Sequence, residues 1–416
     1  MKHKHILAII LVLALALRVI FALIVPVYEK PDEKSHFEYI KYVADNKKLP
    51  VQKEGQYSAE FFQPPFYHFF ASFIFGFTRT LTQNEAYQII LLRLVSVFFS
   101  MLALYLTYKI SSLLFKNKAL NLGILAFASF LPSYINFNSA VTNANFADFL
   151  ATLIVYILLS ILTKGESYKK AILLGIIAGI SLITRLSLIP VIAAIPFAFA
   201  VKYYPNIRKA VKPVVLIAVI ALLISNWLFI RNFTLYGDFL GFNAMKLASP
   251  PDVIKLNLAF AARLLGWTFV TFWAGFGRTN GVFIGNLNSS IGAFIFFISY
   301  FILLLISLSS IFGLCLFFRK CMSNRNILSD AQKKAFIIML VYLALLVFSF
   351  ISFNLYDFQP QGRLFFPAIS VISIFFTLGI YNLFKYCNIK KFLSIYIISL
   401  IFLDVTSIIS VIKYFK

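Results

Sequence analysis

Stretches of about 18 or more apolar residues recur along the whole 416-residue chain. As a helix, each stretch is long enough to cross a hydrocarbon layer about 30 Å thick. Hydrophobic residues make up 61% of the chain and charged residues only 13%, whereas soluble domains average about 45–50% and about 25%. These values exclude a soluble fold. The sequence predicts an all-α, polytopic membrane protein, with one transmembrane domain over residues 1–416 and no soluble domain.

The amino terminus predicts a retained membrane span. Lys2 and Lys4 form a basic flank before an apolar run over Ile6–Val27. This run is too long for a signal peptide and has no small-residue cleavage site. Because positive residues favour the cytoplasmic side, the two lysines place the amino terminus in the cytoplasm of a multi-pass cell-membrane protein.

The same positive-inside rule decides how the next segments lie. If the apolar segment Phe66–Thr82 crossed the membrane, the following run, Ala86–Leu114, would deliver a group of lysines to the outside, namely Lys109, Lys116 and Lys118. We therefore expect Phe66–Thr82 to be a helix that does not cross and that lies in the outer leaflet or against the bundle.

This choice predicts eleven crossings in a bundle of about 11–13 helices. Two long outer segments connect them, residues 28–82 and 232–290. The predicted crossings are Ile6–Val27, Ala86–Leu114, Leu120–Phe137, Phe146–Leu162, Ala171–Thr184, Leu186–Val201, Val214–Ile230, Ile291–Phe318, Ala335–Phe353, Leu364–Phe384 and Phe392–Ile412.

The net charge of +23 follows from this topology. The predicted inner loops hold many lysines and arginines but only two acids, Glu166 and Asp330. A basic cytoplasmic face meets anionic lipid head groups. The charge therefore predicts membrane lipids as partners and does not require nucleic acid.

Unusual polar residues gather on the predicted outer side, where such groups at membrane depth are costly unless they face a cavity or one another. The first segment, Glu29–His36, directly follows the first span. Asp32 and His36 are four residues apart and share a helix face, and a helix cap is the structural alternative for Asp32. The second segment, Glu60–His68, carries Gln63 before a double proline.

A third polar segment, Pro132–Asp148, forms an outer turn between two predicted spans. It offers the amides of Asn143 and Asn145 and the carboxylate of Asp148. Helix capping is the alternative interpretation for the two amides.

Arginines form the fourth group. Arg363 begins a span directly after Gln361 and Gly362, with Asp357 nearby. A guanidinium in such a place can bind phosphate with two parallel hydrogen bonds, or it can snorkel to the interface. Two further arginines on this side, for which anchoring is the alternative, are Arg185 at a hairpin tip and Arg231 at the end of a span.

Four short motifs carry a family resemblance: Pro31-Asp-Glu-x-x-His36, Gln63-Pro-Pro65, Phe272-Trp-Ala-Gly-Phe-Gly277 and Gln361-Gly-Arg363-x-x-x-Pro367. Together with an outer turn that carries an acid, they resemble the GT-C superfamily of integral-membrane glycosyltransferases, and most closely an uncharacterised bacterial and archaeal branch. The resemblance implies a GT-C-like bundle with membrane-parallel helices in the first outer loop. It also implies a sugar donor carried on polyprenyl phosphate.

The resemblance assigns roles to single residues. Asp32 would be the base, with Glu33 and His36 beside it, and Arg185 and Arg363 would face the donor phosphate. The remaining candidates for substrate or donor-phosphate binding are Gln63, Asn143, Asn145, Asp148, Arg231, Trp273, Arg278, Asp357 and Gln361.

The sequence leaves metal dependence open. The second outer turn departs from the family pattern, because Asn143 and Asn145 occupy the place of an acid, which argues against a metal at that turn. Asp32 and Glu33 are the candidate ligands for a divalent ion. The cysteines do not have the spacing of a zinc or redox site and are interpreted as packing residues; they are Cys315, Cys321 and Cys387.

The expected function is an inverting transfer of a sugar from a polyprenyl phosphate to a hydroxyl of a cell-envelope glycan, lipid or protein at the outer face. The leaving phosphate needs fixed cations, and the hydroxyl needs a carboxylate to take its proton. The alternative is a transporter or flippase of a lipid-linked or anionic substrate. That class favours repeated halves and broken helices near the midplane, whereas no internal repeat is evident and the charges gather at one face. A structural subunit is the third interpretation.

Overall fold

The computed structural model describes residues 3–56, 60–248, 254, 257–277, 282–285, 290–324, 326–384 and 389–415. Nine helical segments within these ranges are long and apolar enough to cross a membrane. They are α1 (His3–Ile24), α4 (Glu85–Leu114), α7 (Asn143–Lys164), η1 with α9 (Leu186–Tyr203), α10 (Arg208–Tyr236), α13 (Ser290–Ser323), α14 (Asp330–Asn354), η2 with α15 (Gly362–Phe384) and Ser394–Phe415 of α16 (Ile389–Phe415). The prediction of a polytopic, all-α membrane protein is therefore confirmed.

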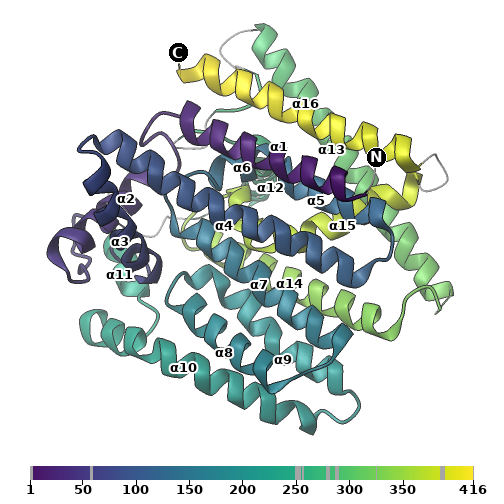
Figure 1. Cartoon of the computed structure of the whole chain (residues 1–416), viewed down its shortest axis with the longest axis horizontal. Coiled ribbons are helices and arrows are strands. Elements are labelled where there is room, and N and C mark those ends of the chain that lie inside the picture. Colours follow the sequence, from purple (N-terminus) through teal and green to yellow (C-terminus); the bar gives the residue numbers. More distant parts are fainter. Residues whose placement is uncertain are drawn as a thin grey trace.

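The long helices run side by side, and the shorter ones fill two places in the bundle (Figure 1). α2, α3 and α11 gather at the end of the bundle where α1 ends, while α5, α6, α8 and α12 lie among the long helices. The shorter helices are α2 (Glu33–Asn46), α3 (Phe66–Leu81), α5 (Lys118–Ser129), α6 (Pro132–Phe137), α8 (Tyr168–Leu182), α11 (Phe242–Ala248) and α12 (Leu258–Ala274).

The helix α3 has one packed face and one open apolar face. Tyr67, Ala71 and Phe75 are buried, whereas Phe73 and Phe77 are more than 60% exposed. This helix has 16 residues and is not among the nine long segments. That it does not cross the membrane stays a prediction.

One predicted crossing, Leu120–Phe137, is divided in two. α5 ends at Ser129 and α6 begins at Pro132, and the intervening Leu131 is extended, with φ −88° and ψ 110°. The residue before a proline is disfavoured in the α conformation, so Pro132 explains the break. The continuous span expected there is corrected to two short helices.

The predicted outer segment 232–290 contains the apolar helix α12, which was not expected. It packs against α6 and η2 (Gly362–Ala368). The Gly362 N–H donates to Thr271 Oγ1 at 2.8 Å, and a Cβ on Gly362 would lie 2.3 Å from the backbone nitrogen of Phe272. Only glycine permits this approach, which fixes the backbone just before Arg363.

Candidate active site

Asp32 lies at the turn between α1 and α2 in a left-handed conformation, with φ 59° and ψ 1°. Few residues other than glycine adopt this region, and such residues cluster at functional sites. Asp32 occupies the N-cap position of α2, but its side chain makes no capping hydrogen bond. Its Oδ2 lies 2.7 Å from Nη1 of Arg363 instead. The helix-cap alternative therefore does not describe this side chain.

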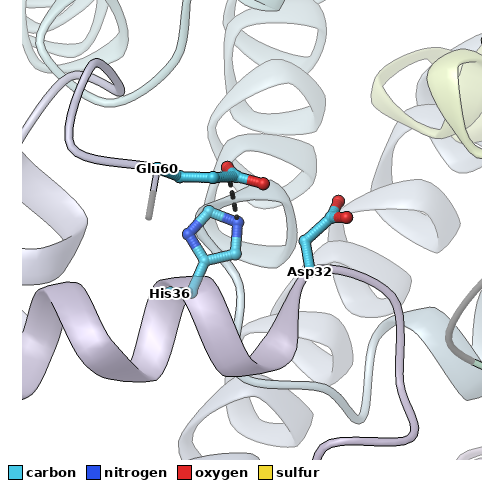
Figure 2. Close-up of side chains that lie close together, drawn as sticks. All are labelled: Asp32, His36 and Glu60. Carbon is cyan, nitrogen blue, oxygen red and sulfur yellow. Dashed lines mark ion pairs between the residues drawn. The ribbon is translucent and has the colours of Figure 1, made fainter. Parts of the chain in front are cut away.

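His36 and Glu60 join Asp32 (Figure 2). His36 Nε2 lies 3.5 Å from Glu60 Oε2, and one ligand atom from each of the three residues lies within 4.8 Å of the other two. The Glu60 side chain extends over the His36 ring, and its carboxylate points toward Asp32. Glu60 was absent from the predicted site, although it begins one of the four polar segments.

The protonation states of these three groups differ. Burial opposes ionisation of Asp32, but the Arg363 guanidinium, and with it Arg185, holds its pKa below the ordinary value. Burial and the nearby Asp32 charge raise the pKa of Glu60 to about 8, against the opposing effect of both arginines. Burial lowers the pKa of His36 to about 3, although Asp32 opposes the shift. These shifts favour an ionised Asp32, a neutral His36 and a protonated Glu60 at neutral pH.

Arg185 and Arg363 line one cavity together with Asp148. Arg185 Nη1 donates to Asn143 Oδ1 at 2.7 Å. Arg363 Nε donates to Gln361 Oε1. Burial and the neighbouring Arg363 lower the pKa of Arg185, while nearby carboxylates, including those of Asp32 and Asp148, oppose this effect. The cavity thus has two guanidinium groups whose positions are fixed by amide side chains.

Amides continue the network toward the first outer loop. Asn143 Nδ2 donates to Gln63 Oε1 and to the Thr184 carbonyl, each at 3.3 Å. Asp148 is 1% exposed and accepts a 3.5 Å hydrogen bond from Asn138. The structure therefore brings together eight of the predicted site residues: Asp32, His36, Gln63, Asn143, Asp148, Arg185, Gln361 and Arg363.

Four other predicted residues have separate partners. Asn145 Nδ2 donates to the Ala140 carbonyl at 2.7 Å, which stabilises its own turn, and Arg231 Nη2 donates to the Pro50 carbonyl at 2.6 Å. Trp273 is 3% exposed and packs edge-on against core aromatics, which are Phe127, Phe272 and Phe376. Asp357 accepts from Gln359 Nε2 at 2.7 Å. Arg278 lies outside the described residues.

The Glu33 carboxylate has its own set of hydrogen-bond donors. Its two carboxylate oxygens accept hydrogen bonds from Arg93 Nε at 2.8 Å and Nη2 at 2.6 Å. They also accept from the backbone N–H groups of Tyr28 and Val141, each at 3.1 Å. The group that could hold a metal ion consists of Asp32, His36 and Glu60, and Glu33 is not a member of it. Of the two ligands that the sequence offered as possible, the structure therefore places Asp32 in such a group and Glu33 outside it.

The donor set of this group fits a divalent ion. Two carboxylates and a neutral imidazole are ordinary ligands for zinc and for other transition metals. A ligating histidine usually has a partner on its other ring nitrogen, and here His36 Nδ1 lies 2.9 Å from Nε2 of the buried His68. The His68 ring in turn stacks on Tyr39 at 3.9 Å between centroids. The His36 ring is therefore held in one orientation.

Comparison with known proteins finds similarity in structure alone. No protein-family model matches the chain, and no curated protein matches it in sequence. A structure of the Archaeoglobus fulgidus oligosaccharyltransferase in complex with zinc and sulfate matches with a TM-score of 0.58 and 14% identity, over 97% of this chain and 53% of that one.

Two further structures show the same similarity. ArnT from Cupriavidus metallidurans bound to undecaprenyl phosphate has a TM-score of 0.54 and 12% identity, over 90% of this chain and 59% of its own. Archaeal AglB from A. fulgidus, in complex with an inhibitory peptide and a dolichol-phosphate, has a TM-score of 0.53 and 12% identity, over 97% and 54%. The chain therefore has the GT-C membrane glycosyltransferase fold and spans little more than half the length of these proteins.

Proposed function

We propose that this chain is a glycosyltransferase that moves a sugar from a polyprenyl phosphate to a hydroxyl of a cell-envelope glycan, lipid or protein. The observation that carries the proposal is the contact between Asp32 and Arg363 at 2.7 Å, beside a cavity that Arg185 also lines. A carboxylate base and two phosphate-binding cations thus lie at one place. The fold supports the proposal, because structures with the same fold hold undecaprenyl phosphate or dolichol-phosphate.

In this mechanism Arg185 and Arg363 bind the oxygens of the donor phosphate. Asn143 and Gln361 fix the two side chains through hydrogen bonds, and Arg363 also lies over the Phe137 ring, 5.0 Å from its centroid. Cations that are held before the reaction stabilise the charge that develops on the leaving group without having to reorient. The arginines therefore act mainly in the transition state.

Asp32 is the base. Its pKa lies below the ordinary value, so it is ionised at neutral pH and can accept the proton of the acceptor hydroxyl. The hydroxyl oxygen bonds to the anomeric carbon while the bond from that carbon to the phosphate oxygen breaks. The polyprenyl phosphate leaves with the electron pair, and a single displacement inverts the anomeric configuration.

Asp32, His36 and Glu60 are the residues that would hold a divalent ion. When bound, such an ion would add positive charge for the phosphate. Because a metal ligand must be deprotonated, Glu60 would lose its proton on binding. His68, which stacks on Tyr39, keeps the His36 imidazole aligned whether or not an ion is present.

We propose the topology together with the function. The site lies at the end of the bundle where α1 ends, among α2 and α3 (Figure 1). With the amino terminus in the cytoplasm of the cell-membrane protein, this end faces outside. The single transmembrane domain, 1–416, and its two outer segments, 28–82 and 232–290, follow from the same orientation.

Transfer by the purified protein tests the proposal. The protein is reconstituted into liposomes with radiolabelled polyprenyl-phosphate sugars, one at a time, and with envelope glycans, lipids or peptides as acceptors. We expect label to move covalently to an acceptor from at least one lipid-linked donor and from no nucleotide sugar. Movement of intact lipid-linked sugar between leaflets, without cleavage of the sugar–phosphate bond, would support the transporter alternative instead.

A further inference from the structure

We propose that Arg93, together with Glu33 and Lys30, forms a buried clamp that holds Asp32 in its left-handed conformation against Arg363. In this proposal the three clamp residues are positioning residues that do not touch the substrate. The proposal rests on the function above in one respect, because it takes Asp32 to be the base of the transfer.

Arg93 joins the end of one helix to the start of another. It lies in α4, and its side chain is 1% exposed. Nη1 donates to the carbonyls of Ala22 and Val25, each at 2.7 Å, and Nη2 donates to that of Pro26 at 3.0 Å. The last carbonyls of a helix have no partner within it. Arg93 therefore supplies donors both to the end of α1 and to the turn that follows it.

The same guanidinium holds the first residue of α2. Glu33 is fully buried and accepts from Arg93 Nε and Nη2 at 2.8 and 2.6 Å. A planar guanidinium makes two such bonds in parallel, and a lysine ammonium does not. One arginine therefore fixes both the beginning and the end of the turn that contains Asp32.

Lys30 attaches this turn to a second part of the fold. The side chain is fully buried, and its Nζ donates to Ser139 Oγ at 2.6 Å and to the Asn136 carbonyl at 3.1 Å. These partners lie in α6 and in the connection that leads to α7. Asp32 therefore has anchored residues on both sides, two positions before it and one after.

A strained conformation persists only where the surrounding structure determines it fully, and the φ of 59° at Asp32 is such a conformation. A stabilising role alone does not account for the clamp. Burial of an arginine–glutamate pair removes both charges from water, and well-packed apolar residues of similar volume are often as stabilising. An apolar pair, however, makes no directional hydrogen bonds and would not fix the backbone on either side of Asp32. The hydrogen-bond geometry therefore points to a role in placing the Asp32 carboxylate.

The first experiment separates positioning from stability through steady-state kinetics. Arg93→Lys keeps the charge and loses the two parallel bonds to Glu33. We expect kcat to fall by about 10–100-fold, in keeping with the effect of a misplacement of about 1 Å, while the KM for the donor changes less than about twofold. The matched control is Arg79→Lys, because Arg79 makes a 2.6 Å pair with Asp45 that is partly exposed; this variant should match wild type.

A second measurement needs no catalysis. In a background without Cys315, Cys321 and Cys387, a short bifunctional thiol reagent joins the two thiols of the double variant Asp32→Cys/Arg363→Cys. Adding Arg93→Lys should reduce the cross-linking yield several-fold, and adding Arg79→Lys should not. If Arg93→Lys fails to insert, the double variant Glu33→Met/Arg93→Met, which removes both charges at similar volume, takes its place in both experiments.

The results of the two experiments distinguish an error in the proposed function from an error in the proposed clamp. If wild-type protein transfers no sugar but cross-linking still depends on Arg93, the proposed function is wrong and the clamp stands. If transfer occurs, and kcat and the cross-linking yield are unchanged in Arg93→Lys, the clamp is overturned. A variant in which kcat and thermal stability fall while the KM for the donor rises, with normal cross-linking, also overturns it, because Arg93 would then serve the fold alone.

Discussion

Asp32 and Arg363 come from distant parts of the chain and meet at 2.7 Å. Each affects the state of the other. The guanidinium stabilises the ionised carboxylate and so helps to lower its pKa, and the carboxylate orients the guanidinium beside the cavity. The pair therefore links the proposed base to the proposed phosphate site within a single contact.

Substitution of Arg363 should impair use of the donor. Arg363→Lys keeps the charge but loses bidentate binding, and Arg363→Ala should lose more, about 2–4 kcal/mol of transition-state stabilisation. Without Arg363, less opposes the upward shift that burial causes in the pKa of Asp32. This pKa should therefore rise, and the acid limb of the kcat/KM profile should move to higher pH. Arg231→Ala, which removes a contact with the Pro50 carbonyl, is the control. Unchanged donor affinity and turnover in both Arg363 variants would make this residue an interfacial anchor.

His68 offers a test of whether Asp32, His36 and Glu60 bind a metal ion. It lies behind His36, with 2.9 Å between Nε2 and the His36 Nδ1. Loss of such a partner typically weakens metal binding by about 10–100-fold, so His68→Ala should weaken zinc binding by that amount in a calorimetric titration. His5→Ala, at an exposed position in α1, should bind zinc as wild type does. Equal affinities for all three proteins would mean that His36 is not a zinc ligand.

The sequence predicts the types of residue in the site better than it predicts their partners. Asp32 and His36 share a helix face, and this places them together correctly. Sequence spacing cannot reveal which of the arginines reaches Asp32, because that contact joins distant segments. Glu60 was missed because the sequence of a loop with two prolines does not show where the Glu60 side chain points. Arg93 carried a usable signal, since an arginine inside an apolar helix usually has a buried partner.

At the scale of helices, the contact between η2 and α12 sets the position of Arg363. A Cβ on Gly362 would meet the backbone of Phe272 at 2.3 Å. Overpacking of this kind typically costs about 1–3 kcal/mol, so Gly362→Ala should lower the thermal unfolding temperature of the purified protein. Gly266, which lies in α12 like Phe272, has open space around it. Gly266→Ala should leave that temperature unchanged or raise it, and equal effects of the two variants would contradict this account.

Two stretches of the chain show what a hydropathy pattern does not predict. Leu120–Phe137 has the composition of a continuous span, yet Pro132 divides it into α5 and α6. The helix α12 begins at Leu258 and lies inside a segment that the charge rule assigned entirely to the outside. Hydropathy finds apolar length, but it does not show whether a helix packs on its neighbours.

The whole molecule has a polar site at one end of an apolar bundle. α2 and α3, which carry His36 and His68, lie where α1 ends (Figure 1). Composition and apolar length were sufficient to predict a polytopic, all-α protein, because no soluble fold accommodates them. The GT-C fold required the short motifs as well, and the structural similarity confirms that prediction.

The orientation of the bundle can be measured by labelling. In a cysteine-free background, an impermeant thiol reagent applied to intact cells should label a cysteine that replaces the exposed Glu54 of the first loop. It should not label Lys118→Cys until the membrane is opened, because the lysines at 109, 116 and 118 are expected in the cytoplasm. Labelling at position 118 from outside would overturn both the topology and the assignment of Phe66–Thr82 as a helix that does not cross.

The central claim is that Asp32 takes the proton of the acceptor while the arginines hold the donor phosphate. The most direct test is the rate of sugar transfer in liposomes by wild-type protein and by Asp32→Asn, which keeps the shape of the side chain and removes its basicity. A general base contributes about 10²–10⁴-fold. We therefore expect transfer to fall by that factor, with membrane insertion and donor binding retained. Near-wild-type transfer by folded, inserted Asp32→Asn protein would contradict the account.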